Sequence, residues 1–93
     1  MSKYTLLSND LIRDPNLSPY EKIVLIDIIS YHNKDIGYAF PTYEILMNDT
    51  GINKRTLMKS LDVLEKLDFI KRETLEGGNR NKYIVNEKYL VVK

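Results

Sequence analysis

The sequence predicts an α+β fold in which three helices are followed by a two-stranded β-hairpin. Three observations carry this prediction. Ser18 and Glu21 form a capping box around Pro19, immediately before a strongly apolar run. Two further helical segments are separated by a tight turn at Gly51. Two strand-like segments then flank a glycine-rich stretch at 76–81, which is typical of a hairpin turn.

Length and composition restrict the class of protein. The 93 residues, 43% of them hydrophobic, suit one small domain spanning residues 1–93. The chain has no cysteine, which excludes disulfides and thiolate zinc sites. Its N-terminus lacks the apolar core of a signal peptide, and no apolar run approaches the roughly 20 residues that span a bilayer. We therefore expect a soluble, cytoplasmic protein that needs no metal or cofactor and contacts no membrane.

The first helix is predicted to begin at Pro19 and to end between Tyr31 and Asn33. It is apolar on most of its circumference, so we expect it to be the central core helix. The only histidine, His32, lies near its end, where an imidazole interacts favourably with the last carbonyl groups. A loop then leads into a short strand expected at 38–40.

Residues 42–68 have the features of a helix-turn-helix unit. Thr42 begins the second helix, and Gly51 ends it because glycine can adopt a positive φ. Ile52 is expected to fill the corner, and Asn53 can cap the third helix through its side-chain oxygen. In this arrangement the third helix leaves its first two turns free to enter a DNA major groove, which is about 12 Å wide.

The third helix is predicted from Lys54 to about Asp68. Its core-facing stripe comprises Leu57, Leu61 and Leu64, widened by Val63 and Leu67. Its outer face carries Arg55, Lys59, Asp62 and Lys66. Asp62 is spaced to pair with Lys66 at i+4. The basic residues of this helix therefore point away from the core.

The charge distribution says more than the net charge of +1. Residues 53–60 contain three basic residues and no acidic one, a net +3. Residues 71–82 contain four basic residues against two acidic ones, a net +2, so the rest of the chain carries −4. This polarity would orient the molecule on a polyanion such as DNA.

The start of the third helix is the predicted recognition surface. Basic residues near the positive end of a helix dipole are unfavourable by a few tenths of a kcal/mol, and an anionic partner would offset this. The candidate DNA-binding residues are Asn53, Lys54, Arg55, Thr56 and Lys59. The alternative is a solvated surface helix, and Asn53 serves equally well as a simple helix cap.

Residues 69–85 are predicted to form the hairpin, or wing, with a basic tip. The candidate DNA-binding residues of the wing are Arg72, Asn79, Arg80 and Lys82. Lys71 and Arg72 alternate along a strand, so only one of them can face the DNA. The alternative is an ordinary polar hairpin turn, for which glycine and asparagine are common.

The sequence does not predict an enzyme. A single histidine cannot build the metal site that nucleophilic-tyrosine nucleases require, although the chain has seven tyrosines. The chain contains no Ser/His/Asp set and no phosphate-binding glycine loop. Four of the tyrosines are better explained by packing in or around the core: Tyr20, Tyr31, Tyr38 and Tyr83.

Five segments resemble a known family. They are LSPYEK at 17–22, AFPTYEIL at 39–46, TGINKRTL at 50–57, LEKLDFI at 64–70 and GNRNKY at 78–83. Together they resemble the winged helix-turn-helix domain at the N-terminus of plasmid replication initiators and phage replisome organisers of Gram-positive bacteria. The resemblance covers nearly the whole chain.

The resemblance implies sequence-specific binding of double-stranded DNA in plasmid or phage replication, with other replication proteins as further partners. It matches residues 53–56 and Lys59 to the recognition helix, and Asn79, Arg80 and Lys82 to the wing. Transcription regulators and partition proteins share the fold, and a protein-interaction module without DNA binding is the alternative from another class.

The chain departs from the family in two ways. Such initiators usually carry a further domain that loads the replication machinery, so this sequence corresponds to an excised DNA-binding domain or to a small stand-alone protein. Asp68 also stands where relatives commonly place glycine at the end of the recognition helix.

Apolar residues gather at both ends of the chain beyond what one small core needs. They are Tyr4, Leu6, Leu7, Leu11 and Ile12 at one end and Tyr89, Leu90, Val91 and Val92 at the other. Since one such domain contacts few base pairs, we expect a homodimer in which these ends form a self-complementary patch. The alternative is that they fold back over the first helix within a monomer.

Overall fold

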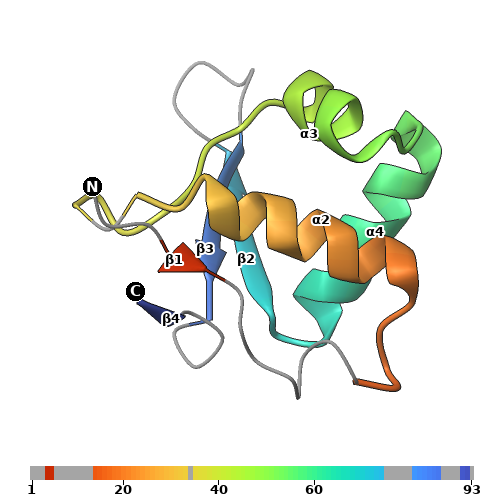
Figure 1. Ribbon diagram of the computed structural model, residues 1–93, viewed down its shortest axis with the longest axis horizontal. Helices are drawn as coiled ribbons and strands as arrows, with labels where there is room; N and C mark the ends of the chain where they lie inside the picture. The colour runs from red at the N-terminus through yellow and green to blue at the C-terminus, as the bar shows by residue number, and fades with distance from the viewer. Residues whose placement is uncertain (1–3, 6–13, 34, 75–80, 87–90, 93) are drawn as a thin grey trace.

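The computed structural model describes residues 4–5, 14–33, 35–74, 81–86 and 91–92. Its elements, in chain order, are β1 (Tyr4–Thr5), α2 (Pro19–Ser30), α3 (Tyr43–Thr50), α4 (Lys54–Lys66), β2 (Ile70–Thr74), β3 (Asn81–Val85) and β4 (Val91–Val92). Three helices followed by an antiparallel hairpin confirm the predicted α+β winged helix (Figure 1). None of the described helices is long and apolar enough to cross a membrane.

The capping box fixes the start of α2. The Ser18 N–H donates to Glu21 Oε1 at 3.1 Å, and the Ser18 hydroxyl donates to the other oxygen of the same carboxylate. The helix begins at Pro19 as predicted. Proline suits this position because it has no N–H, and an N–H in the first turn would find no acceptor within the helix. Its buried face comprises Val24, Leu25, Ile28 and Ile29. Ile23 and Ile26 are about two-fifths exposed, so only one side of the apolar circumference of α2 is buried.

The core lies where α2 meets α3, α4 and the hairpin. From α4 it receives Leu57, Leu61 and Leu64, all fully buried, as the 3.6-residue spacing predicted. Leu67, expected to widen this stripe, is 40% exposed because α4 ends at Lys66. Asp68 then adopts φ 65°, the left-handed conformation that glycine favours. The chain turns sharply there, so Phe69 and Ile70 return to the core.

The hairpin is anchored to the helices by the segment before α3. β2 and β3 pair antiparallel, in register from Ile70 opposite Val85 to Thr74 opposite Asn81. In place of the strand predicted at 38–40, Ala39 forms an isolated bridge with Tyr83: the Ala39 N–H donates to the Tyr83 carbonyl at 2.9 Å, and the Ala39 carbonyl accepts the Tyr83 N–H at 2.7 Å. Most of the predicted turn at 76–81 lies outside the described residues.

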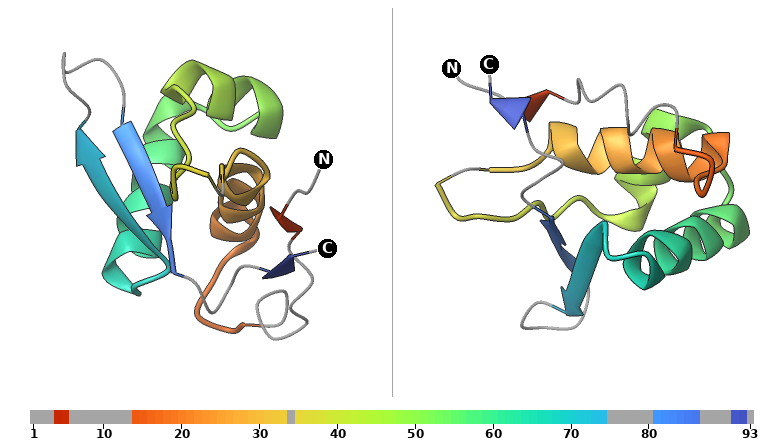
Figure 2. Two further views of the ribbon diagram at one scale, coloured as in Figure 1. Left: turned by 90° about the vertical axis from the view of Figure 1, so that its left-hand side faces the viewer. Right: turned by 90° about the horizontal axis from the view of Figure 1, so that it is seen from below.

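The two ends of the chain lie side by side. β1 pairs with β4, with Tyr4 opposite Val92 and Thr5 opposite Val91, and β1 contacts α2. Figure 2 shows α2 between this pair and the wing hairpin. The described parts of both termini therefore pair with each other within one chain. This pairing agrees with the alternative in which the two ends fold back over the first helix of a monomer. The other residues of the expected dimer patch lie outside the described residues.

Candidate nucleic-acid interface

The turn of the helix-turn-helix is built as the sequence predicted. The Ile45 N–H donates to Thr42 Oγ1 at 3.2 Å, which caps the start of α3. Gly51 ends α3 with φ 73° and donates its N–H to the Met47 carbonyl at 2.8 Å. Ile52 is buried, with only 8% of its surface exposed. These contacts fix the angle at which α4 leaves the turn.

Asn53 is the N-cap of α4. Its Oδ1 accepts the Thr56 N–H at 2.8 Å, which satisfies one of the amides that a helix start leaves without a partner. Asn53 therefore caps the helix, which is one of the two roles that the sequence suggested for it. The side-chain amide nitrogen remains a donor that can reach a phosphate or a base. Thr56 is half-buried behind this cap.

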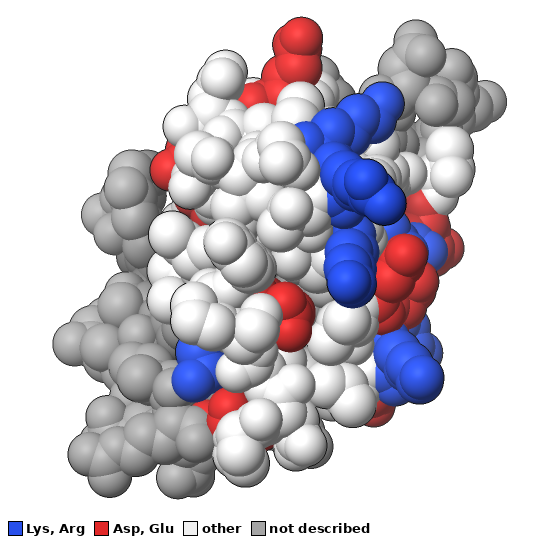
Figure 3. Space-filling view, turned by 90° about the vertical axis from the view of Figure 1, so that its right-hand side faces the viewer, with Lys and Arg blue, Asp and Glu red and all other residues white. Residues whose placement is uncertain are grey.

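The outer face of α4 carries the three predicted cations. Lys54, Arg55 and Lys59 are exposed, and no acidic residue stands in the first turn of the helix. In the part of the chain that the structure describes, no ion pair involves any of the three. Figure 3 shows basic side chains gathered in a stripe beside a broad surface that carries few charges. Their charges are available to an anionic partner.

The Arg72 side chain is held by two carboxylates of α4. Its guanidinium lies 2.6 Å from Asp62 Oδ1 and 3.0 Å from Glu65 Oε1, and its backbone N–H donates to Glu65 Oε2 at 3.1 Å. Asp62 thus pairs with Arg72 and not, as expected, with Lys66. The charge predicted to face DNA is balanced by two carboxylates, because β2 runs beside the acidic turn of α4.

The same contacts change the pKa of Glu65. The backbone N–H of Arg72 and then its guanidinium stabilise the carboxylate, which lowers the pKa of Glu65 below its usual value. We call Arg72, Asp62 and Glu65 the helix–wing clamp. Sequence reasoning missed it, although one signal existed: Asp62 and Glu65 are three residues apart and so lie on one face of the helix.

Lys82 is the predicted wing residue that the structure describes best. Its Nζ lies 4.7 Å from the centre of the Tyr38 ring and 4.0 Å from Glu73 Oε2, the limit of an ion pair. Tyr38 in turn meets Phe40 edge to face, with ring centres 6.0 Å apart. The ring contact positions Lys82 without neutralising it. Asn79 and Arg80 lie outside the described residues.

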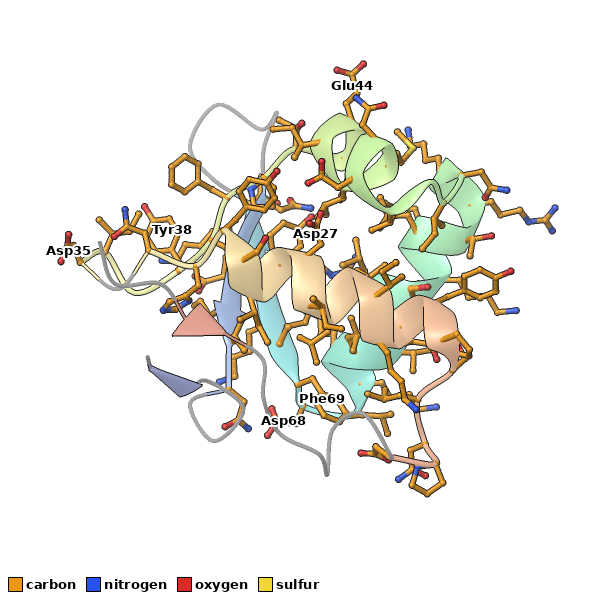
Figure 4. All side chains as sticks on the ribbon, in the orientation of Figure 1. Asp27, Asp35, Tyr38, Glu44, Asp68 and Phe69 are labelled. Carbon is orange, nitrogen blue, oxygen red and sulfur yellow. The ribbon has the colours of Figure 1, made fainter. Side chains whose placement is uncertain are left out.

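A pair of carboxyl groups joins α2 to the helix-turn-helix. Asp27 of α2 lies between α2 and α3 (Figure 4), beside Asp49 of α3, and the Tyr31 hydroxyl donates to Asp49 Oδ2 at 2.6 Å. Burial, then the hydrogen bond to Asp49 and its charge, raise the pKa of Asp27 to about 7. Sequence reasoning missed this pair; the only signal was one aspartate inside an apolar helix.

The structure also places the four tyrosines assigned to packing and the single histidine. Tyr83 is fully buried and Tyr38 partly buried, as the packing role requires. Tyr20 and Tyr31 are 56% and 40% exposed, so they lie at the surface. The backbone N–H of His32 donates to the Ile29 carbonyl at the end of α2, and burial lowers the pKa of the His32 imidazole.

A comparison with protein families agrees with this geometry. Residues 16–70, more than half of the chain, match a family model described as a helix-turn-helix domain. The protein belongs to this helix-turn-helix family. The match covers all three helices, from the capping box of α2 to the first residue of β2. Comparisons with curated proteins and with solved structures gave no significant match. Family membership supports DNA as the partner of α4.

Proposed function

We propose that this protein binds double-stranded DNA sequence-specifically in the cytoplasm, with α4 in the major groove and the wing on the adjacent backbone. The observation that carries the proposal is the exposed group of Lys54, Arg55 and Lys59, which makes no ion pair with any residue that the structure describes, on a helix that follows a capped helix-turn-helix turn. Arg55 can contact a guanine with two hydrogen bonds, and the lysines suit phosphates. The proposal includes no catalytic step.

The finer role that we propose is the initiation of plasmid or phage replication. Its support is the resemblance of five segments, in order, to the DNA-binding domain of such initiators. Transcription regulation and plasmid partition would use the same surface, so an interface mutation does not separate the three roles. A homodimer is part of the proposal because one helix-turn-helix unit contacts too few base pairs for high specificity.

The decisive experiment is a binding titration on a random-sequence duplex at increasing salt. The three cations of α4 and the wing should neutralise about four or five phosphates, so log K should fall against log salt with a slope of about −4. Binding that salt leaves unchanged, or no binding at about 50 mM salt, contradicts the proposal. That result would favour a protein-interaction module. Selection of bound sequences would then identify the specific site.

A further inference from the structure

The two outer edges of the wing hairpin are closed in different ways. At the β3 edge, Tyr83 exchanges two backbone hydrogen bonds with Ala39, at 2.9 and 2.7 Å. At the β2 edge, no further strand pairs with the hairpin among the residues that the structure describes. There the backbone N–H of Arg72 donates to Glu65 Oε2 of α4, 3.1 Å away. A carboxylate therefore occupies the position that a neighbouring strand would take.

The pairing of the hairpin shows which backbone groups of β2 point outward. Residues opposite each other in an antiparallel pair alternate between exchanging two hydrogen bonds and exchanging none. Arg72 lies opposite Tyr83, and both direct their backbone N–H to partners outside the pair, so they exchange none. The same alternation turns the backbone groups of Ile70 and Thr74 toward the outer edge. The left view of Figure 2 shows β2 as the outer strand, with β3 between it and α2.

We propose that this edge is a pairing site for β2 of a second copy of the chain, and that Glu65 holds the site closed. Exposed strand edges pair readily with other strands, and folded proteins commonly cover or charge them to prevent this. Glu65 is itself exposed, and its carboxylate accepts the outward N–H at the centre of β2. Removing the carboxylate leaves a backbone donor that a second strand can satisfy.

The charges of β2 identify a second copy as the matching partner. In antiparallel pairing centred on Arg72, Lys71 of each copy lies opposite Glu73 of the other. Both side chains are exposed, and opposite charges directly across a strand pair stabilise it, whereas like charges destabilise it. The two-fold axis also sets Arg72 against its own copy, and Asp62 still pairs with each guanidinium. Parallel pairing in register would instead set like charges together at all three positions.

Sedimentation without DNA, at about 10 to 300 µM protein, tests whether Glu65 closes the edge. We expect Glu65→Ala to double the sedimenting mass of the parent. Glu65→Gln should keep the parent's mass, because its amide oxygen can still accept the Arg72 N–H. Asp62→Ala is the matched control, since it removes the other carboxylate of the helix–wing clamp and leaves that N–H covered. Circular dichroism checks folding, and Glu65→Leu, which keeps an aliphatic side chain on α4, replaces an alanine variant that does not fold.

Charge reversal tests the partner and the register. On the Glu65→Ala background, Lys71→Glu sets acidic side chains opposite each other, and Glu73→Lys sets basic ones opposite each other. Neither protein should therefore associate alone at about 50 mM salt, where screening is weak. An equal mixture of the two restores opposite charges at both positions and should reach the mass of the Glu65→Ala protein.

Three results would overturn the inference. The first is a folded Glu65→Ala protein, or its Glu65→Leu replacement, with the mass of the parent. The second is association of either charge-reversed protein alone, which would show that the strands do not meet in this register. The third is an equal increase in mass for Asp62→Ala, which would assign the effect to a loosened clamp. Because no DNA is present, none of these results bears on the proposed function.

Discussion

α4 and the wing carry similar numbers of cations, but the surroundings of these cations differ. Lys54, Arg55 and Lys59 are exposed and take part in no ion pair among the described residues. Arg72 is held by two carboxylates of α4, and Lys82 lies against an aromatic ring beside Glu73. The number of basic residues in the sequence therefore overstates the positive charge that can contact DNA phosphates. Arg72, where the wing meets α4, also holds the two elements together.

The largest expected effect comes from removing the exposed cations of α4. Arg55→Ala and Lys59→Ala should each weaken binding to a selected site by about 10- to 100-fold, because a base contact is worth roughly 1–3 kcal/mol. The free energy of unfolding should change by less than about 0.5 kcal/mol, since both side chains are exposed. Fluorescence anisotropy and urea unfolding measure the two quantities. If both variants bind like the parent, α4 is not the recognition helix.

Arg72→Ala should show whether the Arg72 side chain stabilises the fold or contacts DNA. We expect it to lower the free energy of unfolding by about 1 kcal/mol, because the clamp is only partly buried and leaves two carboxylates without their partner. The pKa of Glu65 should rise only part of the way toward its usual value, because the backbone N–H of residue 72 remains, and NMR titration can follow this rise.

The control for the clamp is Lys71→Ala, one residue earlier on β2 and exposed. It should leave both stability and the pKa of Glu65 unchanged. If Arg72→Ala instead reduces the salt dependence of DNA binding by a full unit without changing stability, Arg72 contacts phosphate and the clamp assignment is wrong.

The carboxyl pair of α2 and α3 gives the opposite case, in which two acidic groups lie together and one of them keeps its proton. Folded Asp27 keeps a proton that the unfolded chain releases above pH 4, so the folded state binds more protons between about pH 4 and 7. Stability should therefore fall as pH rises through this window. After allowance for solvent screening, the loss should be about 1 kcal/mol.

Urea unfolding from pH 4 to 8 measures this contribution. Asp27→Asn should remove most of the decrease, whereas Asp35→Asn, at an exposed loop position, should retain it. A parent whose stability increases over the same window would show that Asp27 does not hold a proton there.

The smallest effect concerns Lys82. Lys82→Ala should weaken binding to cognate and random duplexes equally, and it should flatten the salt slope by about one unit, as loss of a single phosphate contact does. Tyr38→Leu should give part of the same change by releasing the Lys82 side chain from the ring. Loss confined to the cognate sequence would instead mean that the wing reads bases.

Local patterns in the sequence determined the architecture. The capping box placed the start of α2, and Gly51 and Asn53 placed the turn and the start of α4, because capping depends on residues only three or four apart. The period of Leu57, Leu61 and Leu64 identified the buried face of α4 and, by exclusion, its basic face. Asp68, where the resemblance led us to expect glycine, adopts a positive φ of 65°, the left-handed conformation that glycine favours.

Only the tertiary structure decided which charges are paired and which apolar residues are left at the surface. Arg72 meets Asp62 and Glu65, ten and seven residues away, and Asp27 meets Asp49 because separate helices pack together. Helical periodicity shows which residues share a face but not which neighbour covers it. For that reason the exposure of Tyr20 and Ile23 could not be predicted from the apolar run of α2.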